Sequence, residues 1–158
     1  MFEDHCCGVI RPAVEDDFDE IMNIERRCFG LKRSYSKRQL RYLLCKGNRT
    51  FLVYDFNGEV KGFIVLLYRK GTRVAGLETM DVDPLHQGQG IGFRLYRSAE
   101  DEARSRGIKK IRLEVSVRNH RAINLYRKLG FNIVETLNDY YHYSYNGSKD
   151  ALRMVKEL

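Results

Sequence analysis

The chain has 158 residues, of which 28 are Lys or Arg and 21 are Asp or Glu, so its formal net charge is +7 at pH 7. This length suits a single domain, which we place over residues 1–158. No stretch approaches the roughly 20 apolar residues of a membrane span, and no early window has the pattern of a signal peptide. The sequence therefore predicts a soluble, unprocessed, cytoplasmic protein with no membrane partner.

The cysteines lack the spacing of a metal site. Cys6, Cys7, Cys28 and Cys45 form no CxxC pair, and only His5 lies near two of them. We therefore expect buried or incidental thiols and no metal. The positive charge would attract anionic ligands such as nucleotides or nucleic acid. Because Lys and Arg are spread along the whole chain, we do not expect nucleic acid as the partner.

The first half of the chain predicts two helices and a meander of strands. We expect a strand at 9–11, a helix at 15–29, a helix that Ser36 caps and that runs toward Gly47, strands at 50–56 and 60–68 joined by an Asn57-Gly58 hairpin turn, and a strand at 77–82. Glu25 interrupts the first helical pattern, because it falls near the middle of the apolar stripe. A carboxylate there is unfavourable unless it pairs with a cation or faces a cavity.

The most informative stretch is Gln87-Gly88-Gln89-Gly90-Ile91-Gly92, between the strand at 77–82 and a helix expected to end near Arg106. A glycine-rich turn from a strand into a helix points backbone N–H groups at one spot near the positive end of the helix dipole, which suits a phosphate. Beyond it we expect a strand at 111–117, a helix that Asn119 caps and that Gly130 follows, and strands at 131–137 and 151–155.

Two common phosphate-binding folds disagree with this pattern. A doubly wound dinucleotide fold needs strands and helices that alternate from the start, whereas here a meander of strands comes first. A GxGxxG pattern that begins at Gly88 would need a third glycine where Phe93 stands, and no GxxxxGK[ST] segment is present for a P-loop. The turn therefore belongs to another kind of phosphate site.

Gln87, Gly90 and Gly92 match the Gln/Arg-x-x-Gly-x-Gly/Ala signature of the GNAT superfamily of N-acetyltransferases. Downstream, Leu113-Glu114-Val115, Asn119 and the run Ala-Ile-Asn-Leu-Tyr-Arg-Lys-Leu-Gly-Phe at 122–131 closely resemble the ribosomal-protein alanine and protein N-terminal acetyltransferase branch. The resemblance implies an α/β (α+β) fold, with a mixed, mostly antiparallel, splayed central sheet of about seven strands and about four flanking helices.

The resemblance also implies acetyl-CoA as co-substrate, with no metal. Its contacts in the family match Met80, Asp81 and Val82 on the strand, Gln87, Gly88, Gln89, Gly90, Ile91, Gly92 and Phe93 at the turn, and Asn119. A side chain at 90 or 92 would keep a diphosphate away from the backbone amides. Asn119 could equally be a plain helix cap that needs no ligand.

Two residues match the family's acid–base pair. Glu114 matches the general base, acting through water, and Tyr126 matches the general acid that protonates the leaving thiolate. An α-amine with a pKa near 8 is roughly a tenth neutral at pH 7, so it needs only a modest base, and a phenol with a pKa near 10 stays protonated. A surface glutamate and a core aromatic remain the alternatives. Glu25 would bind the acceptor amine or share the role of base, unless it pairs with an arginine.

The acceptor side differs from its relatives. Tyr140 and Tyr141 resemble paired tyrosines that close over the acceptor's N-terminus, although hairpin packing would also explain them. The usual proline after that pair is missing. A Phe-Pro-x-Pro-Trp-Ser-like loop of the relatives is replaced by residues 29–36, in which Leu31 and Tyr35 are candidate substrate contacts. Lys32 and Arg33 in this loop either favour an acidic acceptor residue or are solvated.

The resemblance thus implies an acetyl-CoA-dependent enzyme that acetylates the N-terminal α-amine of proteins or peptides. No cysteine occupies a motif position, so we expect direct transfer in a ternary complex. The alternatives are a protein lysine or a small-molecule amine as acceptor and, in a different class, a non-catalytic CoA-binding module. Association with a ribosome or an auxiliary subunit, and the choice between monomer and homodimer, stay open.

Overall fold

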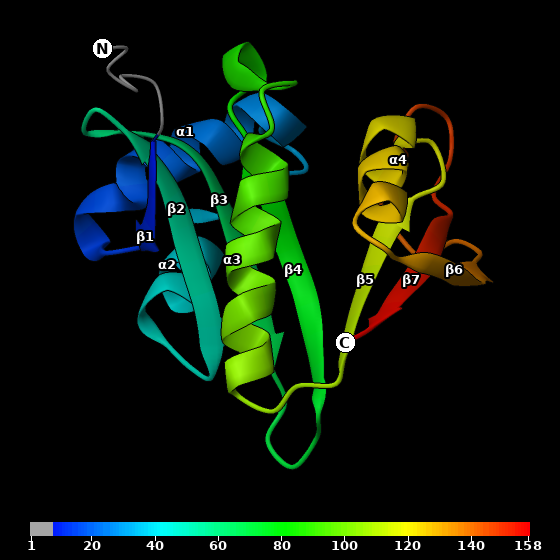
Figure 1. The fold of residues 1–158 in the computed structure, drawn as a ribbon. Helices are drawn as coiled ribbons and strands as arrows, with labels where there is room; N and C mark the ends of the chain where they lie inside the picture. Colours follow the sequence, from blue (N-terminus) through cyan, green and yellow to red (C-terminus); the bar gives the residue numbers. More distant parts are fainter. Residues whose placement is uncertain (1–7) are drawn as a thin grey trace, which may run out of the picture.

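A seven-stranded sheet forms the centre of the computed structural model, which describes residues 8–158 (Figure 1). Cys6, Cys7 and His5 lie outside these residues. The elements are β1 (Val9–Pro12), a 3-10 turn η1 (Glu15–Asp17), α1 (Phe18–Phe29), α2 (Lys37–Cys45), β2 (Arg49–Phe56), β3 (Glu59–Tyr68), β4 (Val74–Val82), a 3-10 turn η2 (Pro84–His86), α3 (Ile91–Ser105), β5 (Lys110–Ser116), α4 (His120–Lys128), β6 (Asn132–Leu137) and β7 (Ala151–Glu157). The predicted order of helices and strands is confirmed.

Local signals of the sequence set several of these elements. The Ser36 hydroxyl accepts a hydrogen bond from the Gln39 backbone N–H (3.2 Å) and begins α2, and the Gln39 side chain returns a bond to the Ser36 N–H (2.9 Å). Asn57 (φ 53°) and Gly58 (φ 84°) both have left-handed backbones, as a tight hairpin between β2 and β3 requires. Both predictions are confirmed by the structure.

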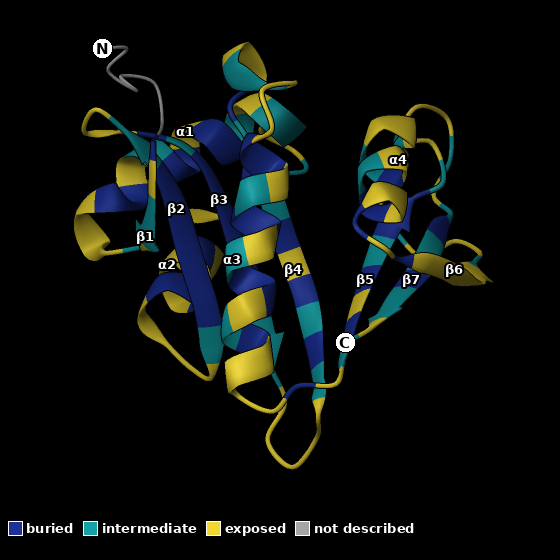
Figure 2. Cartoon of the chain, in the orientation of Figure 1, coloured by how far each residue is buried: buried dark blue, intermediate teal, exposed yellow. Residues whose placement is uncertain are grey.

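The strand order is β1-β2-β3-β4-β5-β7-β6, and every neighbouring pair is antiparallel except β4 and β5. This is the mixed, mostly antiparallel sheet that the sequence predicts. Helices α1 and α2 bury their apolar stripes against one face of β2 and β3. Helix α3 packs on the other face of these strands, and α4 lies over β5 and β7 (Figure 1). Buried residues concentrate along β2, β3 and the inner side of α3, whereas β6 is exposed along most of its length (Figure 2).

The sheet splits between its two parallel strands. β4 and β5 pair only at Val74–Lys110, Ala75–Ile111 and Gly76–Arg112, and then diverge (Figure 1). On β4 the divergence coincides with a bulge, because Leu77 and Thr79 face successive residues of β3 and leave Glu78 between them. A bulge bends a strand and increases its twist. The predicted splay of the sheet is therefore present, and β4 carries its free edge.

Among the described residues, no helix combines the length and the apolarity that crossing a bilayer requires. The longest helix, α3, has 15 residues and presents Leu95, Ala99 and Ala103 to the core.

Gly62 on β3 lets α3 approach the sheet closely. A Cβ atom at this position would lie 3.0 Å from the Asp81 carbonyl oxygen and 3.2 Å from side-chain carbons of both Ile91 and Leu95. We expect Gly62→Ala to lower the free energy of unfolding by about 1–3 kcal/mol, as overpacking does. Urea denaturation measures this. Gly76→Ala is the matched strand control, because its Cβ would meet no described atom within 4 Å. Equal effects of the two substitutions would contradict the close packing.

Candidate functional site

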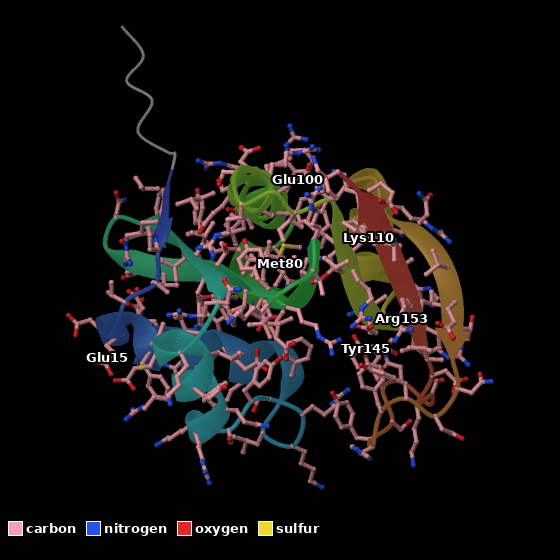
Figure 3. The ribbon with its side chains drawn as sticks, turned by 90° about the horizontal axis from the view of Figure 1, so that it is seen from below. Glu15, Met80, Glu100, Lys110, Tyr145 and Arg153 are labelled. Carbon is pink, nitrogen blue, oxygen red and sulfur yellow. The ribbon has the colours of Figure 1, made fainter. Side chains whose placement is uncertain are left out.

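The split in the sheet holds two pockets that meet beside β4. One, of about 790 Å³, lies at the glycine turn and is called the turn pocket. The other, of about 340 Å³, lies toward α1 and the connection between β6 and β7, and is called the α1-side pocket. Met80, Asp81, Asn119 and Tyr145 line both. Seen from below, Met80 lies on β4, with Tyr145 and Arg153 across the gap on the side of β7 (Figure 3).

The edge of β4 presents backbone groups to this gap. Asp83, just beyond the strand, donates its N–H to the Lys61 carbonyl of β3 (2.8 Å). Because backbone groups of successive strand residues point to opposite sides, those of Met80 and Val82 point away from β3, to the side from which β5 has parted. The Val82 carbonyl accepts hydrogen bonds from the Gln87 side chain (3.0 Å) and the Cys28 thiol (3.3 Å). Apart from this carbonyl, the strand offers an edge without strand partners to an extended ligand.

The glycine turn leaves backbone donors at the start of α3. Gly90 caps the helix with a left-handed backbone (φ 80°) and has no side chain to satisfy the first N–H groups. Added bulk at Gly92 would enter the turn pocket beside Leu125, Met80 and Val82, all within 3.7 Å of a Cβ built there. The cations Arg27, Arg121 and Lys128 line the same pocket. This combination of free amides and positive charge suits an anionic group.

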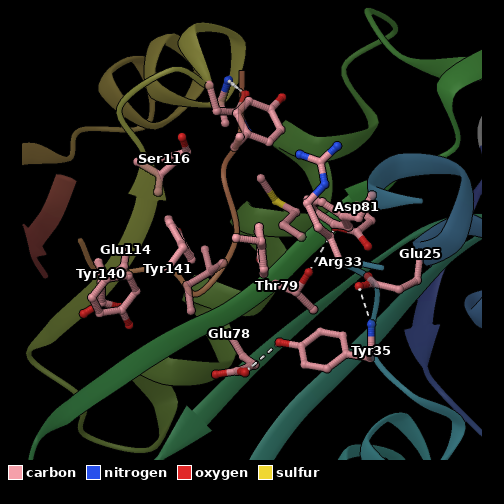
Figure 4. A pocket seen from close by; sticks show the side chains of 18 of the residues that line it. Glu25, Arg33, Tyr35, Glu78, Thr79, Asp81, Glu114, Ser116, Tyr140 and Tyr141 are labelled. Carbon is pink, nitrogen blue, oxygen red and sulfur yellow. Dashed lines mark hydrogen bonds between the residues drawn. The ribbon is translucent and has the colours of Figure 1, made fainter. Parts of the chain in front are cut away.

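The α1-side pocket has the opposite charge. Four carboxylates line it, from Glu25, Glu78, Asp81 and Glu114 (Figure 4). Among the described residues that line the pocket, Arg33 is the one cation. A chain with a net charge of +7 therefore places a concentrated negative charge at this point.

Glu25 and Asp81 form a buried carboxyl pair. Their exposed fractions are 2% and 3%, and Figure 4 shows them side by side. Glu25 accepts the Tyr35 backbone N–H (3.1 Å) and Asp81 accepts the Thr79 hydroxyl (3.0 Å), but within residues 8–158 the second oxygen of each carboxyl has no hydrogen-bond partner. Burial, and then the neighbouring Glu25, raise the pKa of Asp81 well above its usual range. Two such carboxyls do not both ionise, so the pair holds one proton and one negative charge.

Tyr126 and Glu114 lie in the same pocket in different environments. Tyr126 is 8% exposed and packs edge-on against Phe131, with ring centroids 5.8 Å apart. Burial is the main cause that raises the pKa of its phenol, which stays protonated at neutral pH. Glu114 instead accepts a hydrogen bond from Arg153 (3.1 Å) and has Arg112 at 3.4 Å. It is a paired carboxylate at the wall of the pocket.

Aromatic side chains close the α1-side pocket from two loops. Tyr140 and Tyr141 contact edge to face with centroids 4.9 Å apart, and Tyr143 stacks on Tyr141 at 5.6 Å. From the α1–α2 loop, Tyr35 donates its hydroxyl to Glu78 (2.6 Å). Arg33 reaches across to lie over the Tyr145 ring at 5.1 Å. The α1–α2 loop and the connection between β6 and β7, called the tyrosine connection, therefore meet over the cavity.

The structure brings almost all the sequence-predicted site residues to these two pockets. The exceptions are Gln89, which is exposed, and Leu31, which is 81% exposed, and neither lines a pocket. The Asn119 side chain caps α4 by accepting the Ala122 N–H (3.3 Å), so it has the cap geometry and also lines both pockets. In residues 8–158, no group of three or more His, Cys, Asp or Glu side chains could hold a metal ion.

Sequence reasoning missed several lining residues. Glu78 could have been noticed as a charged residue inside the strand pattern, and Tyr143 and Tyr145 continue the tyrosine-rich connection that already pointed to Tyr140 and Tyr141. The contact of Arg121 with the Gln87 side chain (2.6 Å) joins α4 to the turn and has no local signal.

Comparisons with known proteins agree with this geometry. The sequence model of the acetyltransferase (GNAT) family matches residues 18–131. An uncharacterized N-acetyltransferase of Methanocaldococcus jannaschii is 29% identical over 161 aligned positions, which cover 94% of this chain and 66% of that protein. The [ribosomal protein bS18]-alanine N-acetyltransferase of Escherichia coli K12 is 40% identical over 81 positions, which cover 51% of this chain and 54% of the relative. The chain thus spans between half and two thirds of these curated relatives.

A solved structure extends the likeness to the whole fold. The crystal structure of the ribosomal-protein-S18-alanine N-acetyltransferase from Escherichia coli superposes with a TM-score of 0.83 and 28% identity, over 95% of this chain and 93% of that one.

The Asp81 pair makes stability depend on pH. Because the folded state raises the pKa of Asp81, it keeps this proton at pH values where the unfolded chain has lost it, so the contribution to stability is full at low pH and falls as pH rises. The slope is about 1.4 kcal/mol per pH unit while only the folded state holds the proton. We expect Asp81→Asn to gain stability relative to wild type between pH 5 and pH 8 in urea titrations.

The exposed Asp101→Asn on α3 is the control for this titration and should show no such pH-dependent gain. A constant difference between Asp81→Asn and wild type across the pH range would contradict the shared proton.

Proposed function

The chain belongs to the acetyltransferase (GNAT) family, and on that premise we propose that it transfers the acetyl group of acetyl-CoA to the N-terminal α-amine of a protein or peptide. The observation that carries this proposal is the opposite charge of two joined pockets. A cationic pocket suits the diphosphate of the donor, and an anionic pocket suits the ammonium group of an acceptor. Because they meet beside β4, donor and acceptor would lie next to one another.

The turn pocket has the donor groups that coenzyme A needs. The N–H groups at the start of α3 and the cations Arg121 and Lys128 would hold the diphosphate. The edge of β4 at Met80 and Val82 would pair with the amide groups of the pantetheine arm, as an added strand does. Acetyl-CoA would supply the activated thioester when bound. The Val82 N–H would then stabilise the negative charge that develops on the carbonyl oxygen.

The acceptor amine would bind at the carboxyl pair. Glu25 and Asp81 together carry one negative charge, which attracts the ammonium group and can take its proton. Glu114, held by Arg153, would accept a proton through water from the outer wall of the same pocket. Tyr126 keeps its phenolic proton at neutral pH and would give it to the leaving thiolate.

Cys28 supports direct transfer in a ternary complex. Among the described cysteines it is the one that lines a pocket, where burial raises the pKa of its thiol to about 12. The thiolate is the nucleophilic form of cysteine, so this residue is poorly suited to carry an acetyl group. Its thiol instead donates to the Val82 carbonyl.

The choice of an α-amine rests on amine basicity and on the relatives. An α-amine is roughly two hundred times or more as often neutral at pH 7 as a lysine side chain, so one modest base is enough. Relatives named as ribosomal-protein alanine N-acetyltransferases support a protein N-terminus as acceptor. Tyr140 and Tyr141, at the rim of the α1-side pocket, would close over the first residue.

A peptide panel tests the acceptor. Purified protein, acetyl-CoA and peptides with free or blocked N-termini, each with one internal lysine, are analysed by mass spectrometry with fragment assignment. We expect acetylation at the free N-terminus and none on blocked peptides. Acetylation confined to lysine side chains or to polyamines would contradict the N-terminal acceptor and identify a lysine or a small amine as the acceptor. No transfer to any amine would favour a CoA-binding module.

Tyr126 is tested against a matched tyrosine. Tyr126→Phe should lower kcat by about 10²–10⁴-fold, because a general acid contributes this much, while the Kd for acetyl-CoA stays nearly unchanged. Tyr96 packs edge-on against the same Phe131 (5.5 Å) from α3 but lines neither pocket, so Tyr96→Phe should leave kcat close to wild type. An equal loss of kcat and acetyl-CoA affinity in Tyr126→Phe would mean that Tyr126 has a structural role instead.

A further inference from the structure

The net positive charge of the chain comes from one segment beside the α1-side pocket. Between Glu25 and Asp55 there are nine Lys or Arg residues and no Asp or Glu, and outside this segment Lys and Arg do not outnumber Asp and Glu. The segment comprises the end of α1, the loop that enters the pocket, α2 and most of β2, and seven of its nine cations precede the end of α2. A charge this concentrated attracts anions locally, whatever the average over the surface.

Arg33 is the member of this segment that lines the pocket. It is half-buried, and its guanidinium lies over the Tyr145 ring at 5.1 Å. Within residues 8–158 the guanidinium makes no hydrogen bond and no ion pair, although four carboxylates line the same pocket. An arginine that an aromatic ring holds in place, without an anion, keeps its five N–H donors available.

Each of the four carboxylates has at least one partner other than Arg33. Glu25 accepts the Tyr35 backbone N–H and faces Asp81, while Asp81 accepts the Thr79 hydroxyl. Glu78 accepts the Tyr35 hydroxyl. At the far wall, Glu114 pairs with Arg153. None of the four bonds to Arg33, so its N–H donors stay available to an anion from another molecule.

Further cations continue from Arg33 along the exposed face of α2. Lys37, Arg38 and Arg41 are exposed, and none of them has an ion pair with a described residue. Lys37 and Arg38 lie in the first turn of the helix, where positive charge opposes the helix dipole and costs about 0.3–1 kcal/mol per residue. Helix stability therefore does not explain their position.

We propose that the acceptor is an acidic polypeptide. This inference rests on the proposed function, in which the α-amine of the acceptor binds at Glu25 and Asp81. An Asp or Glu within the first few residues of the acceptor would then bind the Arg33 guanidinium. Further acidic residues of the acceptor would lie along Lys37, Arg38 and Arg41. The carboxylates of the pocket thus select an amine, and Arg33 selects the chain that carries it.

The test compares peptides that share their first residue and differ at the next two, which are Asp-Glu or the neutral Asn-Gln. We expect kcat/KM to be at least about ten-fold higher for the acidic peptide, mostly through KM, since a charge-assisted hydrogen bond contributes this much. The preference should shrink as salt screens the charge. Arg33→Gln should bring the ratio of the two kcat/KM values close to one, and Arg33→Lys should keep part of it.

Two further variants guard against a folding artefact. Arg33→Glu should reverse the preference toward a matched Lys-Lys peptide, a gain that misfolding does not produce. Lys37→Gln combined with Arg38→Gln should reduce the preference only for peptides with acidic residues further along. Lys70→Gln, an exposed cation in the turn between β3 and β4, is the control and should leave the ratio unchanged.

The outcomes separate this inference from the function on which it rests. Equal N-terminal acetylation of acidic and neutral peptides would overturn the acidic acceptor and leave the N-terminal acetyltransferase intact. A preference that survives Arg33→Gln would overturn the role of Arg33. No N-terminal acetylation of either peptide would overturn both. Competition of a short RNA with the neutral peptide, with no preference between peptides, would assign the basic face to nucleic acid instead.

Discussion

The parting of β4 from β5 is the constraint on which the rest of the site depends. The two strands are held together over three residue pairs, and beyond them Met80 and Val82 turn their backbone groups toward a gap. A buried strand edge without partners is unfavourable, so it is stable only where water or a ligand supplies hydrogen bonds. The bulge at Glu78 produces the bend without breaking the pairing of β3 with β4. The sheet therefore presents the edge of β4, inside the molecule, to a ligand.

The same split separates charge. Helices α3 and α4 lie on one face and supply free amides and cations at the turn pocket, while α1 and the tyrosine connection enclose carboxylates on the other side. Because Met80 and Asp81 line both pockets, only the thickness of β4 separates an anion-binding site from a cation-binding site. Alternation along this strand assigns the sides: Met80 and Val82 point their side chains toward Gly92, and Asp81 points its side chain toward Glu25.

Most of the fold could be predicted from the sequence because its signals are local. The Ser36 cap, the Asn57-Gly58 turn and the glycine turn act within a few residues of themselves. The surroundings of Asp81 and Arg33 depend on contacts between distant segments: α1 must lie on β4 before Asp81 faces Glu25, and the α1–α2 loop must reach the tyrosine connection before Arg33 meets Tyr145. The charge was also easy to misjudge, since Lys and Arg are spread along the chain whereas Asp and Glu are absent from 26–54.

Glu25 illustrates how a position that looks unfavourable in sequence can serve two purposes. The helical pattern puts it on the apolar stripe of α1, and the structure buries it there with one oxygen on the Tyr35 backbone N–H. This bond holds the loop that carries Arg33. Glu25 therefore positions that loop and also contributes a carboxyl group to the α1-side pocket. Asp81 makes no bond to that loop, and its hydroxyl partner Thr79 lies on its own strand. Of the two carboxyls, Asp81 is therefore the one that can be replaced without also releasing the loop.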